Sequence, residues 1–350
     1  MSTRHTGERI SNYLLEAQVG AGSFGEVWRA RHHVFDDVVA IKIPTDPQYV
    51  RNLRREGLAV HGLRHPNIVR VIDLDPYADP PYLVMEYIDG SSLREVIDHH
   101  KADIPLEAAV EIIRGVLHAV GAAHDGGMVH RDIKPANILL NHPIDQIASV
   151  TERLVKVTDF GLGDVGVATT QSIMQSGSMV TQDGRSIAGT LAYMSPEQKE
   201  GADLDGRSDL YACGIVLFEL LTGERPQGYD VPSALRPEVP VLLDDVFRRC
   251  YTRRERRYGS AGEMLAALDS RKAPRRTKTS PPPVPRRWLP PGREPRCPGC
   301  DAAVHRDDQF CICCGRQLVE YVPRCPTCHA YVHSPDLFCI YCGTDLRILA

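Results

Sequence analysis

Three polar residues stand close together in residues 129–140, which read VHRDIKPANILL. Asp132 offers a carboxylate, Lys134 follows two positions later, and Asn137 follows five positions after the aspartate. Transfer of a phosphoryl group needs a carboxylate that accepts the proton of the attacking hydroxyl, a cation beside the moving phosphate, and an oxygen ligand for Mg²⁺. The segment has residue types for all three roles, although on its own it could be an ordinary loop.

A glycine-rich pattern lies upstream, where Gly20, Gly22 and Gly25 are followed by Val27. Glycines at this spacing let backbone N–H groups approach phosphates, because no Cβ stands in the way. A dinucleotide-binding turn would need a helix directly after the glycines. Here the alternation of apolar and polar residues predicts a strand on both sides, which rejects that alternative.

Three charged residues complete a possible phosphate and metal site. Lys42 ends the apolar stretch VVAIK and can bind the α- and β-phosphates, and Asp159 in VTDFG can bind Mg²⁺ through a charged oxygen. Glu56 lies on a helix expected from about residue 51 and can pair with Lys42. Each residue taken singly could be a solvated surface charge, and it is their order along the chain that favours a shared function.

The elements expected to position these residues change in character along the chain. Residues 13–88 alternate with a period of two and contain turn residues, which predicts a strand-rich lobe interrupted by one helix at about 51–63. From residue 93 onward the apolar residues recur with helical spacing. The stretch 210–221 is apolar apart from Glu219 and predicts a buried helix, in which Cys213 is a core residue.

This succession of motifs resembles the eukaryotic-like (bacterial-type) Ser/Thr protein kinase family over roughly residues 13–270. The lysine in DIKPAN is similar to the Ser/Thr branch. The resemblance implies an α+β bilobal protein kinase fold, with a β-rich N-lobe and a helical C-lobe. It implies a non-specific serine/threonine protein kinase (EC 2.7.11.1) that transfers the γ-phosphoryl group of ATP to protein hydroxyls. The alternative is a pseudokinase-like scaffold that binds nucleotide and acts through its C-terminal module.

The resemblance also implies residue roles. Asp132 is the catalytic base, Lys42 pairs with Glu56, and Asn137 and Asp159 bind Mg²⁺. The remaining ATP-binding residues comprise the phosphate-covering glycines, the residues on either side of adenine, the gatekeeper and the two hinge positions: Gly20, Gly22, Gly25, Val27, Ala40, Leu139, Met85, Glu86 and Ile88.

Other residues are expected to support the site. The resemblance implies that Glu197 pairs with Arg257 and that Asp209 anchors the catalytic loop from the buried helix, whereas His130 packs beneath the loop. Arg131 can pair with a phosphate on the activation segment. We therefore expect autophosphorylation within residues 169–186, against the alternative of an unmodified Ser/Thr-rich loop.

Two segments depart from the family pattern. Residues 141–157 are longer than the usual hairpin, which predicts an insertion near the back of the site. Residues 222–247 run almost directly from the loop after the buried helix to a late helix. The helix that often docks substrates is therefore expected to be shortened or absent, which leaves substrate recognition open.

Residues 273–295 are rich in proline and arginine and predict an extended linker, with a spacer favoured over a peptide ligand. After it, a pattern of four cysteines recurs 28 residues later. Two C-x-x-C pairs can place four thiolates around one Zn²⁺. The expected ligands of two zinc sites are Cys297, Cys300, Cys311, Cys314, Cys325, Cys328, Cys339 and Cys342. The spare Cys313 leaves the register of the first unit ambiguous, and the exact repeat favours Cys311 and Cys314.

The sequence thus predicts an N-terminal tail at 1–12, a kinase domain at 13–272, the linker, and a double zinc ribbon at 296–346. The expected cofactors are ATP, Mg²⁺ and two structural Zn²⁺ ions. A slightly acidic ribbon favours a protein partner over nucleic acid. The N-terminus shows no apolar leader and no stretch is long enough to span a bilayer, so we expect a cytoplasmic protein.

Overall fold

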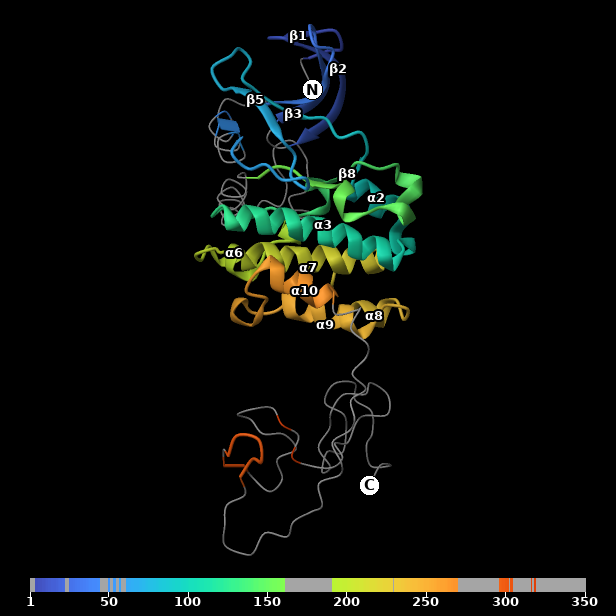
Figure 1. Ribbon diagram of the computed structural model, residues 1–350, viewed down its shortest axis with the longest axis vertical. Helices are drawn as coiled ribbons and strands as arrows, with labels where there is room; N and C mark the ends of the chain where they lie inside the picture. Colours follow the sequence, from blue (N-terminus) through green and yellow to red (C-terminus); the bar gives the residue numbers. More distant parts are fainter. Residues whose placement is uncertain are drawn as a thin grey trace, which may run out of the picture. The chain divides into compact units, whose positions relative to one another are not determined.

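The computed structural model of the chain describes residues 4–22, 25–44, 50, 53–54, 57, 61–160, 191–228, 230–269, 296–301, 303–304, 316 and 318. The chain divides into two compact units, residues 1–273 and residues 274–350. In the first unit a sheet forms one end and a stack of helices forms the other (Figure 1). The expected strand-rich lobe followed by a helical lobe is confirmed.

The N-lobe is a six-stranded sheet with the order β1-β2-β3-β4-β6-β5, in which all neighbours are antiparallel. Its strands are β1 Arg9–Ile10, β2 Tyr13–Gly22, β3 Gly25–His32, β4 Val38–Ile43, β5 Val71–Asp75 and β6 Tyr82–Glu86.

The central strand β4 shows how the sheet positions a functional side chain. Successive side chains of a strand point to opposite faces. Val39, Ile41 and Ile43 pack into one apolar cluster, whereas Ala40 belongs to another. Lys42 is two positions after Ala40, so both side chains lie on the same face of β4. The fold therefore directs the ammonium group of Lys42 toward the face that carries the second cluster.

A second, three-stranded sheet connects the lobes. It contains β7 Ser91–Ser92, β8 Ile138–Leu140 and β9 Val155–Val157. Val157 donates its N–H to the carbonyl of Asn67 (2.8 Å) and accepts from the N–H of Val69 (2.9 Å). Strand β9, which pairs with β8 directly after the catalytic loop, is therefore tied to the segment that leads into β5.

The helical lobe is built around α7 Arg207–Thr222, in which every residue except Arg207 is buried. Its apolar surface is continuous because other helices cover it on several sides, and this confirms the predicted buried helix. The helices that contact α7 are α2 Leu93–His100, α3 Leu106–Asp125 and α9 Val241–Cys250, and α10 Ala261–Asp269 packs on α3 and α9. Figure 1 shows α7 running alongside α3. Cys213 is fully buried, as expected of a core residue, and Cys250 on α9 is fully buried as well.

The insertion after β8 forms two short 3₁₀ helices, Ile144–Ser149 and Glu152–Leu154. It packs on α3, where Arg114 donates to the carboxylate of Glu152 (3.0 Å). A Cβ on Gly115 would lie 2.6 Å from the carbonyl oxygen of Glu152, so this approach requires glycine. The extra residues are therefore an ordered addition to the helical lobe.

The segment after α7 confirms the predicted loss of a helix. Between α7 and α9 the only helix among the described residues is α8 Pro232–Leu235, which has four residues. Asp244 holds it in place by accepting from the backbone N–H of Ser233 (2.9 Å) and from its hydroxyl (2.5 Å).

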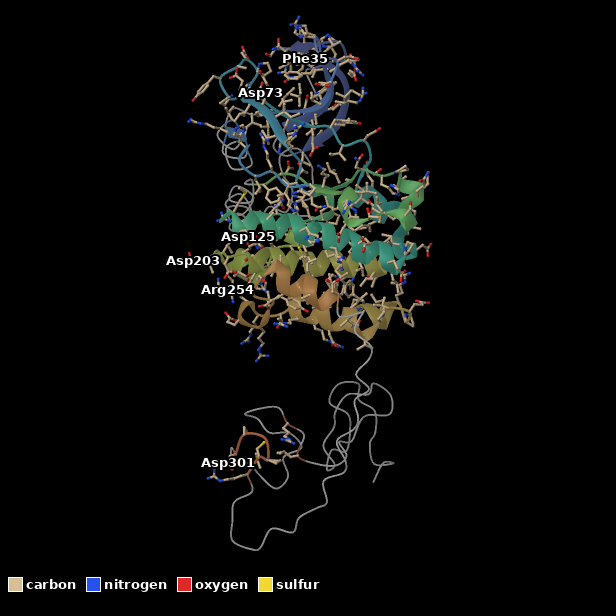
Figure 2. The ribbon with its side chains drawn as sticks, viewed as in Figure 1. Phe35, Asp73, Asp125, Asp203, Arg254 and Asp301 are labelled. Carbon is tan, nitrogen blue, oxygen red and sulfur yellow. The ribbon has the colours of Figure 1, made fainter. Side chains whose placement is uncertain are left out.

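The two ends of the first unit differ in their surfaces. Phe35, in the turn between β3 and β4, is 72 % exposed and lies at the end of the sheet farthest from the helices (Figure 2). Over the part of the chain that the structure describes, no helix is both long and apolar enough to cross a membrane.

Candidate active site

The catalytic loop brings Asp132, Lys134 and Asn137 together. Lys134 Nζ lies 2.8 Å from Asp132 Oδ2, and the amide nitrogen of Asn137 lies 3.1 Å from the same oxygen. Asn137 also donates to the backbone carbonyl of Asp132 (2.9 Å). Because its NH₂ group is engaged with Asp132, the amide oxygen of Asn137 is the atom left to act as a metal ligand.

Asp209 on α7 holds this loop in its conformation. Its two carboxylate oxygens accept from the backbone N–H groups of His130 (2.9 Å) and Arg131 (2.7 Å). Arg131 has φ +68°, a left-handed conformation that costs an ordinary residue about 1–3 kcal/mol. The hydrogen bonds from a carboxylate that is 1 % exposed help to offset this cost, which confirms Asp209 as the anchor.

His130 has a structural position beneath the loop. It is fully buried, its Nε2 donates to the carbonyl of Thr158 (2.9 Å), and its Nδ1 accepts from the N–H of Asp132 (3.2 Å). Its ring lies 4.4 Å from that of Phe160, centroid to centroid. Both ring nitrogens are thus used to join the catalytic loop to the segment that carries Asp159, as predicted.

Lys42 and Asp159 form an ion pair across the two lobes, with Nζ and Oδ1 2.7 Å apart. Burial alone would raise the pKa of Asp159, but the adjacent Lys42 outweighs it and lowers the pKa below its usual value. The carboxylate is therefore ionised and suited to bind a divalent cation. Asp159 has φ +64°, a second left-handed residue at the site.

Several predicted residues lie outside the described part of the chain. They are Glu56, expected to pair with Lys42, and residues 161–190 of the activation segment, which include the expected phosphorylation sites at 169–186. Six of the eight predicted zinc ligands also lie outside it, namely Cys311, Cys314, Cys325, Cys328, Cys339 and Cys342. These predictions stay as stated.

The glycine hairpin joins β2 to β3, with Gly22 opposite Gly25 and Gly20 opposite Val27. Gly25 has φ +148°, and a Cβ there would lie 2.2 Å from the carbonyl oxygen of Ile43, so the fold itself requires glycine. At Gly20 a Cβ would meet only the Val27 side chain at 3.7 Å, which is ordinary contact. None of the described residues therefore requires glycine at position 20, and its expected role over the nucleotide stays a prediction.

The predicted adenine-binding residues share one apolar cluster. Ala40 and Met85 are buried in it, and three partly buried side chains pack against it. Those three come from β3, the segment after β6, and β8 of the small sheet: Val27, Ile88 and Leu139. The fold therefore gathers residues that are up to 112 positions apart.

Glu86 begins the segment that links the lobes. Its carboxylate accepts from Lys156 Nζ (2.7 Å) and from the backbone N–H of Arg70 (2.9 Å). Four residues on, a Cβ at Gly90 would lie 1.8 Å from the carbonyl oxygen of Leu140. The Lys156 contact was missed from the sequence, because no local pattern links residues 70 positions apart.

Gln198 is a second supporting residue that the sequence analysis missed. It lies on α6 Pro196–Glu200 and donates from Nε2 to the backbone carbonyl of Arg131 (2.8 Å). Ser195 and Gln198 form a capping box, in which the serine oxygen accepts from the N–H of Gln198. The S-x-x-Q spacing is the signal that could have revealed it.

Glu197 on α6 forms the predicted ion pair with Arg257. The guanidinium of Arg257 donates to both carboxylate oxygens (2.5 and 2.8 Å), and Ser208 donates to one of them (2.9 Å). Nearby, Arg254 donates to the backbone carbonyl of Asp203 (2.6 Å), and Figure 2 shows both at one edge of the helical lobe. The end of the activation segment is thereby fastened to the C-lobe core.

This pair predicts a loss of stability in acid. Burial would raise the pKa of Glu197, but hydrogen bonds from Arg257 and Ser208 lower it from 4.5 to about 2. A lowered folded-state pKa contributes stability that is complete above pH 4.5 and is lost as the pH falls through 4.5 toward 2. At pH 3 we expect a loss of about 2 kcal/mol from this group, measured as the free energy of unfolding in urea.

The matched variants are Glu197→Gln and Glu200→Gln, since Glu200 is exposed on the same helix. Glu197→Gln should lower the stability at pH 7 and flatten its dependence on pH between 7 and 3. Glu200→Gln should leave that dependence unchanged. Equal pH dependence in wild type and Glu197→Gln would show that the pair does not titrate in this way.

The described part of the second unit contains the first predicted zinc-binding turn. Cys297 is 2 % exposed, its sulfur accepts from the N–H of Gly299 (3.3 Å), and its carbonyl accepts from the N–H of Asp301 (2.9 Å). Arg296 closes the turn by donating to the carbonyl of Asp301 (2.9 Å). Cys300 lies in this same tight turn.

Comparison with known proteins agrees with both units. The family described as protein kinase domain matches residues 13–235, and the family described as double zinc ribbon matches residues 297–343. The chain is 35 % identical to the serine/threonine-protein kinase PknB of Mycobacterium tuberculosis over 281 residues, which cover 73 % of this chain and 42 % of PknB. It is 36 % identical to PrkC of Bacillus subtilis over 284 residues, covering 75 % of this chain and 41 % of PrkC.

The chain thus spans less than half the length of these curated relatives. A solved structure of the PknI kinase domain of Mycobacterium tuberculosis superposes with a TM-score of 0.58 at 25 % identity, covering 77 % of this chain and 99 % of that one. The kinase match extends over more than half of the chain, and it coincides with the unit that contains the catalytic loop, the Lys42–Asp159 pair and Asp209. The chain therefore belongs to the protein kinase family and carries a double zinc ribbon after its kinase domain.

Proposed function

We propose that this chain is a serine/threonine protein kinase that transfers the γ-phosphoryl group of ATP to hydroxyl groups of protein substrates. The observation that carries the proposal is the assembly of Asp132, Lys134 and Asn137 next to the Lys42–Asp159 pair. His130 and Thr158 join the two groups directly. Phosphoryl transfer depends mainly on positioning and on charge stabilisation, and this site offers both.

The residues present fit Mg²⁺ and ATP. Asp159 supplies an ionised carboxylate and Asn137 an amide oxygen, which are ligand types that Mg²⁺ prefers. Bound Mg²⁺ would neutralise charge on the phosphates. Lys42 lies at the end of β4 beside Asp159, and the glycine hairpin with Gly20, Gly22 and Gly25 borders the same face. The apolar cluster of Val27, Ala40, Met85, Ile88 and Leu139 would hold adenine, with backbone groups of Glu86 and Ile88 as its polar contacts.

Asp132 is suited to orient and deprotonate the acceptor hydroxyl. Its Oδ2 is fixed by Lys134 and Asn137, so the carboxylate enters the reaction already oriented. The ammonium group of Lys134 would lie near the transferred phosphate and stabilise its charge. Lys42, Asp132, Lys134, Asn137 and Asp159 are all present and in contact as pairs, so the scaffold alternative gains no support.

The finer assignments are part of this proposal. We place the kinase domain at 13–272, the linker at 273–295 and the double zinc ribbon at 296–346, with four cysteines for each of two Zn²⁺ ions. The activity corresponds to EC 2.7.11.1 and includes autophosphorylation within residues 169–186. The ribbons would bind a protein partner or regulate the kinase. A cytoplasmic location supplies the ATP and the reduced thiols that these sites need.

Replacement of Lys42 by methionine tests the proposal at the nucleotide. Loss of the ammonium group should lower kcat/KM for transfer from Mg-ATP to a protein acceptor by at least about 100-fold, because one preorganised charge is removed. The matched control is Lys101→Met, since Lys101 is exposed at the end of α2. Lys101→Met should behave as wild type. Undiminished transfer by Lys42→Met would contradict the assigned site.

A further inference from the structure

A hollow of about 1100 Å³ opens beside the catalytic loop. Lys134 of the loop lines it together with residues of α2, α6, α7 and the segment after α7. No residue of α8 is among those that line it. A peptide that presents its hydroxyl to Asp132 would pass along this hollow, so its lining determines which flanking residues the site accepts.

The deepest charge in the hollow is the carboxylate of Glu219 on α7, whose side chain is 4 % exposed. Both of its oxygens are occupied. Oε1 accepts from Arg94 Nη1 (2.7 Å), and Oε2 accepts from the hydroxyl of Tyr193 (2.5 Å). A carboxylate at this depth needs a cation, because removing an ion from water costs several kcal/mol.

That cation comes from the chain itself. Arg94 lies on α2 and donates from its other terminal nitrogen to Asp98 (2.7 Å), which fixes the guanidinium between two carboxylates. Arg94 Nε is buried with no hydrogen-bond partner in the described part of the chain. Each carboxylate oxygen of Glu219 thus has a hydrogen-bond donor, although the Nε–H group of Arg94 has no acceptor among the described residues.

The remaining lining carries charges of both signs. Besides Arg94, three cationic side chains border the hollow, namely Lys134, Lys199 and Arg225. Two further carboxylates line it, Glu224 and Asp98, and Asp98 is already paired with Arg94. An arriving arginine would find both oxygens of Glu219 taken.

We propose that Arg94 is a specificity-determining residue. It occupies the acidic slot formed by Glu219, so the kinase acts on Ser/Thr acceptors flanked by neutral or acidic residues and gains nothing from a flanking arginine. The inference rests on the proposed kinase function. Removal of the guanidinium should expose the buried carboxylate to the hollow and convert the site into one that selects arginine.

The test compares peptides that carry one threonine and either alanine or a single arginine, which is moved position by position around the threonine. Their binding to the full chain is measured by fluorescence anisotropy in the presence of Mg-ADP, and their kcat/KM is measured with Mg-ATP. For wild type the arginine peptides should be no better than the alanine peptide at any position. For Arg94→Met at least one arginine position should be favoured by about tenfold or more, as expected for pairing with a buried charge.

Two further variants separate the explanations. The quantity compared is the ratio of kcat/KM for an arginine peptide to kcat/KM for the alanine peptide. In the double variant Arg94→Met/Glu219→Gln this ratio should return to about one, because the carboxylate has been removed. Arg114→Met is the matched control, since Arg114 is also paired with two carboxylates but lies on α3 outside the hollow. It should keep the wild-type ratios.

An unchanged ratio in a folded Arg94→Met variant, judged by thermal unfolding, would overturn the proposal. So would an arginine preference that persists in the double variant. Failure of the proposed kinase function would give a different result, because wild type would then transfer no phosphate to any peptide. The relative binding of arginine and alanine peptides would still show whether Arg94 controls their selection.

Discussion

Replacement of Asp132 by asparagine is expected to lower kcat/KM for phosphoryl transfer by at least about 100-fold, because general-base assistance contributes on the order of 10²–10⁴-fold. The asparagine oxygen can still accept from Lys134 and Asn137, so the loop should keep its structure. Binding of Mg-ATP should be retained. Radiolabel transfer to a protein acceptor and mass spectrometry of residues 169–186 should both show the loss.

The matched control is Asp145→Asn, an aspartate in the insertion whose side chain is 81 % exposed. This variant should transfer phosphate at the wild-type rate. Equal rates for wild type and Asp132→Asn would show that Asp132 takes no part in the reaction. That result would favour the alternative of a nucleotide-binding scaffold. Phosphate on residues 169–186 of isolated Asp132→Asn would instead identify a contaminating kinase.

Loss of the first zinc site is expected to unfold the N-terminal half of the double ribbon. A structural Zn²⁺ contributes about 10–16 kcal/mol in small peptides, and a unit this short cannot bury enough apolar surface to fold without it. Elemental analysis of wild type should find about two Zn²⁺ per chain. Replacement of Cys297 and Cys300 by serine should reduce this to about one and should make residues 297–314 sensitive to proteolysis.

Cys213→Ala is the matched control, because Cys213 is fully buried in α7 and lies outside the ribbons. Its zinc content should stay at about two per chain even if the kinase domain is destabilised. Wild-type protein that is purified without chelator and holds almost no zinc would contradict the ligand assignment. Zinc that remains at two in the Cys297→Ser/Cys300→Ser variant would show that other side chains bind the first ion.

Much of the site follows from local patterns in the sequence. The alternation in VVAIK places Lys42 on a defined face of β4, and the polar spacing after Asp132 brings Lys134 and Asn137 onto the same carboxylate oxygen. In β4 the alternation of side chains fixes the geometry, and in the catalytic loop the three residues lie within six positions of one another. The Glu197–Arg257 and Asp209 contacts were predictable only through the family resemblance.

Other contacts depend on how distant elements pack, and no sequence pattern reveals them. Arg94 and Glu219 are 125 positions apart and meet because α2 and α7 are neighbours in the fold. The glycine pattern was interpreted as phosphate binding throughout, yet Gly25 is required by the carbonyl of Ile43. The left-handed conformation of Arg131 likewise depends on the carboxylate of Asp209 in a helix far along the chain.

The most direct test of the account follows label from ATP. The full chain is incubated with Mg²⁺, a protein acceptor, and ATP labelled either at the γ- or at the α-phosphate. We predict covalent label on serine and threonine of the acceptor from γ-labelled ATP only, at a rate at least about 100-fold above that of Asp132→Asn. Label from γ-labelled ATP no greater than that given by Asp132→Asn would contradict the proposed kinase activity.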